Sequence, residues 1–153
     1  MALVLGNVES PEELGEYGAS LVVHSTHEQN ELDGRGITSI ISKAAEMKSC
    51  HTVVVNHSSL GKSIIGRLAN RLQAGSVSSA NSVPSSDGDH IKVKRPVFAG
   101  KAIAEFKINT PNRVISLMSN AFPPEKIGSA CDVETINFDA PASAVKVVET
   151  KKS

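Results

Sequence analysis

Continuous apolar runs bounded by turn-forming residues predict strands in the first half of the chain. Residues 2–5 form one such run, which Gly6 ends, and residues 20–24 form a second. Residues 52–55 are continuous and β-branched, which is typical of a strand buried on both faces of a parallel sheet. We therefore expect this third strand to lie near the centre of the sheet.

Three segments between and after these runs have the pattern of helices. A serine, a proline and two acids at residues 10–13 predict a helix start, and Gly18 predicts its end. After a loop over residues 25–36, apolar residues at helical spacing predict helices over residues 37–48 and 60–72. Strand and helix thus alternate, which predicts an open α/β sheet with right-handed crossovers.

The pattern changes in the second half, where apolar and polar residues alternate. Residues 91–95 and 102–108 predict antiparallel strands, and residues 113–117 predict a further strand. The predicted fold class is therefore α/β, with an open, mostly parallel sheet, flanking helices and added antiparallel strands toward the C-terminus.

Composition excludes several classes of function. The chain has 153 residues, of which 40% are hydrophobic and 21% charged, as in an ordinary globular domain. Aromatic residues make up only 3%, without tryptophan, so a surface that stacks nucleic-acid bases is disfavoured. No apolar run approaches the roughly 20 residues of a membrane span, and no signal or transit peptide is visible. We expect a soluble, cytoplasmic protein that binds neither nucleic acid nor membrane.

Charge is balanced overall but uneven along the chain. Sixteen Lys and Arg residues offset sixteen Asp and Glu residues, whereas residues 1–50 carry a net charge of −5 and residues 51–126 carry +6. Such runs commonly form solvated faces. Alternatively, the basic region predicts a complementary acidic surface on a protein partner.

The loop after the third predicted strand is a candidate anion site. A glycine, a lysine and a serine open the next helix, where backbone N–H groups are natural anion ligands. The sequence is not a Walker phosphate loop, because Asn56 stands where that motif requires glycine. The alternative is that Ser58 or Ser59 merely caps the helix. The candidate anion-binding residues are Asn56, His57, Ser58, Ser59, Gly61 and Lys62.

No group of residues predicts catalysis or a metal site. Of the five histidines only His24 and His27 are close in sequence, and no third ligand is spaced to join them. Cys50 and His51 are adjacent, so in a strand their side chains would point to opposite faces. We therefore predict no catalytic residue and no metal ligand.

The segment over residues 95–102 is irregular. Pro96 and Gly100 interrupt what would otherwise be one strand. This predicts a bulge or a close approach of the backbone, and the alternative is a simple kinked edge strand.

Three blocks between residues 53 and 122 together resemble the N-terminal domain of the alpha subunit of electron transfer flavoprotein. Their order and spacing also agree with that family. The blocks are residues 56–62 (NHSSLGK) leading into 67–72 (RLANRL), residues 94–104 (KRPVFAGKAIA), and residues 114–117 (VISL) with 120–122 (NAF). The resemblance implies a fold similar to the adenine nucleotide alpha hydrolases.

The resemblance also implies how the chain is divided. Residues 1–122 correspond to the α/β domain, and residues 123–153 to a tail and linker toward an FAD-binding domain absent from this sequence. The first strand and helix of the family have no counterpart, and Met118-Ser119 stands where relatives commonly have a basic residue. The chain is therefore expected to be a fragment or a truncated gene product, with two strand-like stretches, at residues 133–138 and 145–149, in its tail.

For function, the resemblance implies electron carriage. The family's heterodimer accepts electrons from dehydrogenases, such as the acyl-CoA dehydrogenases of fatty acid β-oxidation, and delivers them to a quinone reductase of the respiratory chain. FAD belongs to the complete alpha subunit and AMP to the beta subunit, so no cofactor is expected in this chain alone. The chain is expected to pack against the beta subunit through candidate contact residues Arg95, Phe98, Gly100 and Phe122.

A second hypothesis comes from a different class of function. The loop over residues 56–62 would bind a phosphate in a free-standing nucleotide-binding module of the universal-stress-protein type. Tight binding of ATP or AMP by the chain alone would favour this hypothesis over the electron carrier.

Overall fold

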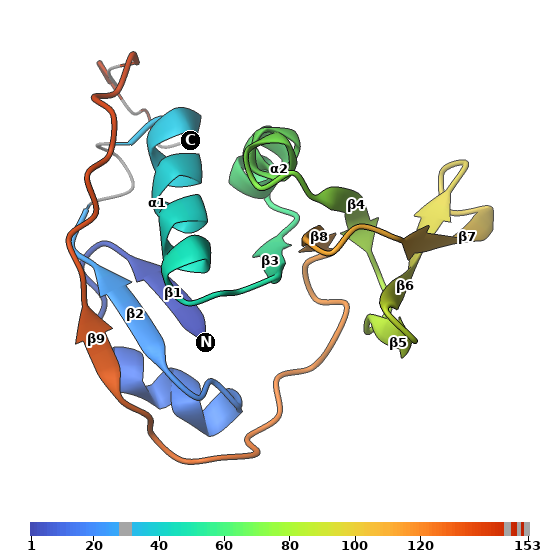
Figure 1. The fold of residues 1–153 in the computed structure, drawn as a ribbon, viewed down its shortest axis with the longest axis horizontal. Helices are drawn as coiled ribbons and strands as arrows, with labels where there is room; N and C mark the ends of the chain where they lie inside the picture. Colours follow the sequence, from blue (N-terminus) through green and yellow to red (C-terminus); the bar gives the residue numbers. More distant parts are fainter. Residues whose placement is uncertain (28–31, 146–147, 150, 152–153) are drawn as a thin grey trace. The chain divides into compact units, whose positions relative to one another are not determined.

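The computed structural model divides into two compact units (Figure 1). The first comprises Met1–Ala44 and Pro124–Ser153, and the second comprises Ala45–Pro123. Each has a three-stranded parallel sheet, and the second also has a three-stranded antiparallel sheet, which confirms the predicted fold class. None of the described helices combines the length and apolar content of a membrane span. The described residues are 1–27, 32–145, 148–149 and 151.

The first unit begins with the elements that the sequence predicts. β1 (Ala2–Leu5) pairs in parallel with β2 (Val22–Ser25), and a 3-10 helix, η1 (Pro11–Tyr17), lies between them in the chain. Gly18 ends this helix with a φ of +95° and donates its N–H to the Gly15 carbonyl. A left-handed conformation at this position favours glycine. The expected helix is therefore present, in the tighter 3-10 form.

One helix and the C-terminal tail complete the first unit. α1 (Gly34–Met47) begins three residues earlier than predicted, and its last turn, from Ala45, belongs to the second unit. The tail contributes β9 (Val133–Thr135), which pairs in parallel with β2 and gives the order β1-β2-β9. The core is formed by four buried side chains, those of Val23, Ile40, Ala44 and Phe138.

The tail crosses η1 in close contact. Gly128 donates its N–H to the Glu16 carbonyl at 3.0 Å, and a Cβ on Gly15 would lie 2.4 Å from the carbonyl oxygen of Ser129. Only glycine allows this approach. Of the two strand-like stretches predicted in the tail, the first contains β9 and the second lies partly outside the described residues. The predicted domain boundary at residue 122 stays a prediction.

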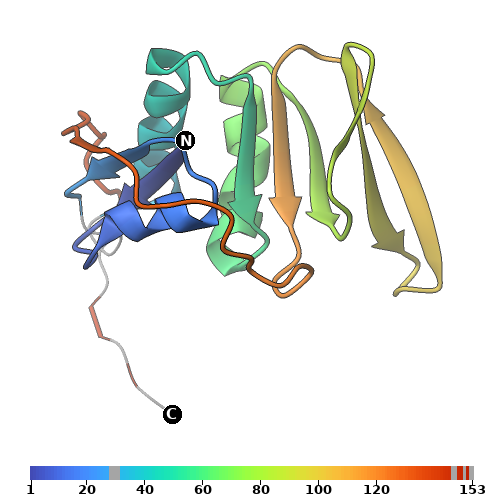
Figure 2. The ribbon, with the colours of Figure 1, turned by 90° about the horizontal axis from the view of Figure 1, so that it is seen from below.

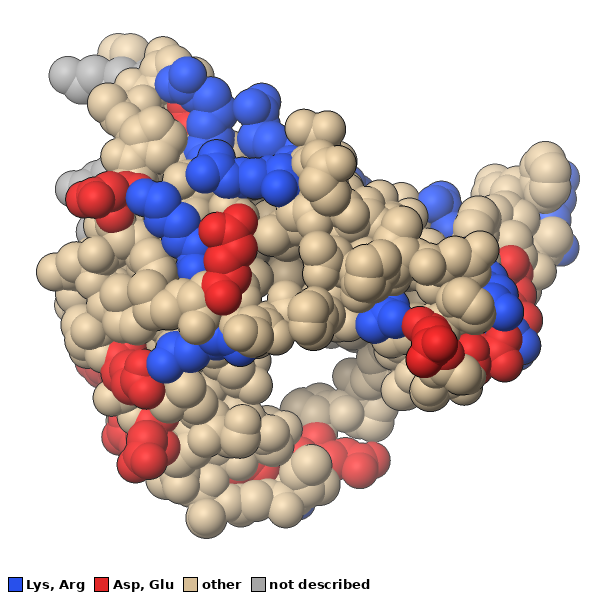
Figure 3. All heavy atoms as spheres, viewed as in Figure 1, with Lys and Arg blue, Asp and Glu red and all other residues tan. Residues whose placement is uncertain are grey.

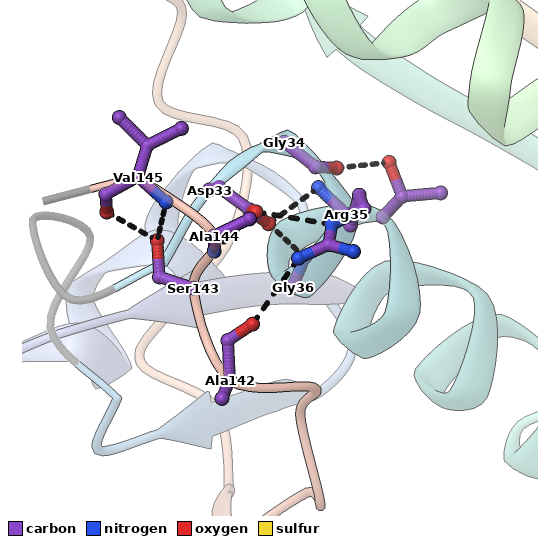
Figure 4. Close-up of polar contacts among 9 residues, drawn as sticks. Asp33, Gly34, Arg35, Gly36, Ala142, Ser143, Ala144 and Val145 are labelled. Carbon is purple, nitrogen blue, oxygen red and sulfur yellow. Dashed lines mark hydrogen bonds and ion pairs between the residues drawn. The ribbon is translucent and has the colours of Figure 1, made fainter.

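Asp33 ties the tail to the start of α1 (Figure 4). Its carboxylate accepts N–H bonds from Arg35 at 2.9 Å, from Gly36 at 3.0 Å and from Ala144 of the tail at 3.0 Å. The Arg35 guanidinium pairs with the same carboxylate at 3.1 Å and donates to the Ala142 carbonyl. The N–H of Ala144, then that of Gly36 and the contacts of Arg35, hold the pKa of Asp33 far below its usual value, although burial opposes this.

The second unit is built on the parallel sheet β3-β8-β4. Its strands are β3 (Thr52–Asn56), β8 (Arg113–Leu117) and β4 (Gly75–Ala80). α2 (Ser59–Arg71) packs against this sheet and buries Ile64, Leu68 and Ala69. The helix predicted over residues 60–72 is thus confirmed.

An antiparallel sheet packs on the same unit in the order β5-β6-β7. Its strands are β5 (Ser85–Asp87), β6 (His90–Val97) and β7 (Ala102–Ile108), so the two antiparallel strands that the sequence predicts are confirmed. Alternate residues of β6 and β7 pack onto one face of the parallel sheet. The shared core is formed by Val77, Ala80, Val93, Ile108 and Ile115.

The predicted central place of residues 52–55 is wrong. Within the described pairing β3 joins only β8, so it is an edge strand, and its Val54 side chain is 50% exposed. The central place belongs to β8, which enters between β3 and β4 from much later in the chain. The strand buried on both faces is therefore β8, where Val114, Ile115 and Ser116 are fully buried.

Replacing Asp33→Asn is expected to release the tail from α1. The substitution removes the negative charge that four donors share, so hydrogen exchange of the Ala144 amide should accelerate at least tenfold at pH 7. The pKa of Asp33 is lower in the folded chain than in the unfolded chain, where it is about 4. The stabilisation is therefore fully present above about pH 4 and is lost as the pH falls from there toward the folded-state pKa.

The matched control is Asp139→Asn in the tail. The backbone oxygen of Asp139 accepts a hydrogen bond from the Lys43 ammonium, and this substitution keeps that oxygen. This control should leave the exchange of the Ala144 amide unchanged. Equal exchange rates in the Asp33→Asn variant and the unmodified chain would show that Asp33 does not hold the tail.

Candidate functional site

The candidate residues of the sequence gather at one edge of the second unit. β3, β8 and β4 run in parallel, so they end at the same edge, which we call the carboxyl edge. Figure 2 shows that β6 points the same way and that the β6–β7 turn also lies at this edge. The carboxyl edge therefore holds the loop after β3, the turn after β8 and the tip of the β6–β7 hairpin.

A histidine and two serines form the centre of the carboxyl edge. His57 Nδ1 lies 2.8 Å from the Ser116 Oγ, and the same oxygen accepts the Ser79 N–H at 3.0 Å. The His57 N–H donates to the Leu117 carbonyl at 2.7 Å. Ser79, with a φ of +64°, lies where the register of β4 shifts between Val77 and Ala80. The irregular end of β4 thus turns a backbone donor toward the end of β8.

Two cations surround this histidine. Burial lowers the pKa of His57 below its ordinary value, and the positive charges of Lys62 and Arg95 lower it further. The lowered pKa favours the neutral imidazole at pH 7 in the hydrogen bond to Ser116. Arg95 donates to the Ser78 Oγ at 3.0 Å, and its guanidinium carbon lies 6.0 Å from the centre of the Phe106 ring.

The start of α2 is closed by its own residues. Ser58 is the N-cap, and its Oγ accepts the Gly61 N–H at 3.2 Å. A Cβ at Gly61 would lie 1.8 Å from the Asn56 carbonyl oxygen, so only glycine fits there. The capping role that the sequence offered as an alternative is therefore present at Ser58. Whether an anion also binds this loop stays a prediction.

The irregular segment over residues 95–102 is neither a bulge nor a kinked edge strand. β6 continues through Pro96, which pairs with Ile103, and the chain then reverses in a tight turn. Phe98 and Ala99 both have positive φ values, +50° and +55°, and the Gly100 N–H donates to the Val97 carbonyl at 3.1 Å. This is the geometry of a hairpin turn whose twist matches the strands.

The hairpin turn carries an exposed aromatic residue at its tip. The Phe98 side chain is 81% exposed, and a left-handed conformation costs a residue with a side chain about 1 kcal/mol or more. Ile103 is 57% exposed and pairs with Pro96 on the face of the hairpin that points away from the shared core. Pro96 and Ile103 thus share the outer face of the hairpin, and the exposed Phe98 lies in the turn beyond them. We call these three residues the hairpin tip.

The rest of the outer hairpin surface is polar. Asp87 pairs with Lys92 and with Lys107, each at 3.2 Å, and these two bonds lower the pKa of Asp87. Lys94 pairs with Glu105 at 3.8 Å. Figure 3 shows positive and negative side chains side by side over the antiparallel sheet. The hairpin tip thus adjoins a surface of mixed charge.

The turn after β8 is joined to the loop after β3. The Ser119 hydroxyl donates to the Asn56 Oδ1 at 2.9 Å, and the Ala121 N–H donates to the Met118 carbonyl at 3.3 Å. Phe122 follows this turn with 37% of its side chain exposed. The structure thus places all the sequence-predicted candidates at the carboxyl edge.

Sequence reasoning missed Ser79, Ser116 and Ile103. Ser116 gave no separate signal, because a serine within an apolar strand matches no chemical motif. Ser79 could not be found, since its role depends on a register shift between distant strands. Ile103 could have been found from the alternation along residues 102–108, which puts it on the opposite face from Ile108. That Ile108 is on the buried face is known only from the structure.

The pKa of His57 tests the electrostatics of the carboxyl edge. NMR titration of the imidazole should give a midpoint below 6.5, the ordinary value. Lys62→Gln and Arg95→Gln should each raise this midpoint, because each removes a nearby positive charge. Lys101→Gln, which removes the same charge from the hairpin turn, should leave it unchanged. A midpoint at or above 6.5 in the unmodified chain would contradict this description.

Comparison with known proteins identifies the family. Residues 1–143 match the electron transfer flavoprotein domain. The Bacillus subtilis electron transfer flavoprotein subunit alpha is 34% identical over 104 residues, covering 65% of this chain and 31% of that protein. The probable mitochondrial alpha subunit of Caenorhabditis elegans is 25% identical over 126 residues, covering 82% of this chain and 35% of that protein.

A third relative, the probable mitochondrial alpha subunit of Cryptococcus neoformans, is 30% identical over 115 residues, covering 71% of this chain and 32% of its own length. The chain therefore spans about a third of the length of the curated relatives it matches. The match extends over both compact units and includes β3, α2, the β6–β7 hairpin and β8. The chain belongs to the electron transfer flavoprotein family, in which its relatives are alpha subunits.

Proposed function

We propose that this chain is the partner-binding part of an electron transfer flavoprotein alpha subunit that forms a heterodimer with a beta subunit. The heterodimer would carry electrons from dehydrogenases, such as acyl-CoA dehydrogenases, to a quinone reductase of the respiratory chain. The observation that carries the proposal is the family match over residues 1–143, with relatives named as alpha subunits. The cytoplasm of a bacterium is the proposed location.

At Gly61, the start of α2 leaves no free donor and no space for the pyrophosphate of FAD. The N–H of Gly61 at the start of α2 is already bonded to Ser58, and the Asn56 carbonyl fills the space beside Gly61. A dinucleotide cradle needs free backbone donors and room for the pyrophosphate at that place. We therefore assign FAD to a longer form of the subunit and AMP to the beta subunit, and we assign no catalytic residue to this chain.

The hairpin tip is the proposed contact with the beta subunit. Phe98 and Ile103 are the apolar side chains that a partner would bury, and Arg95 and Gly100 shape the hairpin from which they project. Phe122 follows the turn after β8 at the same edge of the unit and is also exposed. Aromatic and arginine side chains are the usual anchors of interfaces. The net charge of +6 over residues 51–126 adds attraction for an acidic partner surface.

The carboxyl edge would keep this contact surface rigid. His57 bonds to Ser116, and Ser119 is bonded to Asn56, so the loops after β3 and β8 at this edge are tied to strand ends. Rigid anchors lose less entropy on binding than mobile ones. The chain's own residues therefore position the partner, and electron transfer is the chemistry that the flavin supplies when it is bound.

Co-expression with the beta subunit of its own organism tests the proposal. The chain should copurify with that subunit in a 1:1 complex, and the complex should be yellow only when the subunit includes the downstream FAD-binding region. A chain that stays alone and binds ATP or AMP stoichiometrically would overturn the proposal in favour of the nucleotide-binding module.

Replacing Phe98→Gly separates binding from folding. Glycine relieves the left-handed strain at φ +50°, so the free chain should become more stable by roughly 1 kcal/mol in urea denaturation. Loss of the ring should weaken binding to the beta subunit at least tenfold, about 1.4 kcal/mol.

Ile103→Gln should weaken binding to the beta subunit in the same way. The matched control is Met47→Gln in the last turn of α1, where a 55% exposed apolar side chain is also replaced. This control should leave the affinity unchanged. If Met47→Gln weakens binding as much as Phe98→Gly does, the hairpin tip is not the contact.

A further inference from the structure

A second site lies at the edge of the second unit where β3 and β8 begin. A cavity of about 470 Å³ opens there between the start of these strands and the β5–β6 turn. The carboxyl edge is at the other end of the same strands, so nothing in the proposed function uses this cavity. The polar residues that line it include His51, Ser86, Asp89, His90, Asn109 and Arg113.

Arg113 is the cation of this cavity, and its hydrogen bonding is incomplete. Its Nη2 donates to the Asp89 backbone oxygen at 2.6 Å, which holds the guanidinium against the β5–β6 turn. Its Nε is buried without a hydrogen-bond partner, and Arg113 forms no ion pair within the described residues. A buried donor without an acceptor costs about 1–3 kcal/mol, and more for a charged group. A ligand oxygen that reaches the guanidinium from the cavity would add an acceptor for this group.

The β5–β6 turn places a second unpartnered nitrogen in the lining. Asp87 and His90 are paired in the register of the two strands, with Gly88 at a φ of +61° in the tight turn between them. The Nδ1 of His90 is also buried without a partner. Two residues that line this cavity, on different strands, therefore each carry a polar nitrogen without a partner, which is unusual in a folded chain.

His51 is oriented by a chain of hydrogen bonds. The Asn112 amide nitrogen donates to the Leu72 carbonyl at 2.8 Å, so the Asn112 oxygen faces His51. This oxygen lies 3.1 Å from His51 Nδ1 and accepts a hydrogen bond from it. This arrangement places the proton on Nδ1, and Nε2 is the other polar atom of the ring. The orientation of His51 is thus set before any ligand binds.

We propose that this cavity binds a small carboxylate, with Arg113 and His90 as hydrogen-bond donors to its oxygens. The planar guanidinium matches the two oxygens of a carboxylate. Asp89 is the single acid among the lining residues, and it offsets the charge of Arg113. A carboxylate group brings one negative charge next to Arg113 and Asp89, and the second carboxylate of a dicarboxylate lies further away. A phosphate dianion brings two charges to the same place, which Asp89 would repel more strongly, so the cavity favours a carboxylate.

The test is an NMR titration of the full chain with succinate at constant ionic strength, with sodium chloride as the compensating salt. Succinate should cause saturable shifts in the amides of residues 86–91 and 109–113 and in the Arg113 Nε–H. Chloride alone should not cause these shifts. Inorganic phosphate, titrated in the same way, should bind more weakly than succinate.

Two substitutions should change the affinity in opposite directions. Arg113→Gln should weaken succinate binding at least tenfold, and Asp89→Asn should tighten it severalfold, because it removes the opposing charge and keeps the backbone oxygen that Arg113 contacts. Lys101→Gln, the matched loss of a cation in the β6–β7 turn, should have no effect. If Arg113→Gln does not fold, as judged from the dispersion of its spectrum, Asp89→Asn decides the question by itself.

Three outcomes would overturn this proposal. The first is the absence of a saturable response to succinate, and the second is tighter binding of phosphate than of succinate. The third is an affinity for succinate that Asp89→Asn leaves unchanged. None of them bears on binding of the beta subunit, which depends on the opposite edge of the unit.

Discussion

The position of β8 between β3 and β4 is the constraint on which the second unit depends. β8 pairs in parallel with both neighbours, and its central residues are fully buried, with Ile115 against the antiparallel sheet. Val114 and Ser116 point to the opposite face, on which α2 packs. Because parallel strands end together, this one insertion also brings the loops of three strands to the carboxyl edge.

The two ends of β8 take part in different sites. At its end, Ser116 and Leu117 bond to His57 and so hold the loop that precedes α2. At its start, Arg113 lines the cavity beside the β5–β6 turn with its Nε unsatisfied. At the first site the His57–Ser116 pair is satisfied within the chain, although the Arg95 Nε there is also buried without a partner. The second site differs in having a cavity beside its unsatisfied arginine. The cavity is therefore what makes the start of β8 the proposed ligand site, whereas the end of β8 holds the loops of the proposed partner surface.

Local patterns in the sequence predicted most strands and helices, because apolar periodicity reports which face of an element is buried. They do not report the order of strands in the sheet, so they predict a central place for residues 52–55, whereas β3 lies at the edge. The hydrogen bond between His57 and Ser116, 59 residues apart, has no local signature either. The turn at Phe98 was missed because neither phenylalanine nor alanine indicates a positive φ. The three blocks that carry the family resemblance, by contrast, contain residues that the fold brings together at the carboxyl edge.

The most direct test is a hydrogen-exchange comparison of the chain free and bound to the beta subunit. If the hairpin tip is the contact, binding should bring new protection at the β6–β7 turn, around Phe98 and Gly100, and in the turn that precedes Phe122. The β5–β6 turn beside Arg113 should not change. Protection confined to that β5–β6 turn, or no protection anywhere in the second unit, would contradict the proposal that the hairpin tip is the contact with the beta subunit.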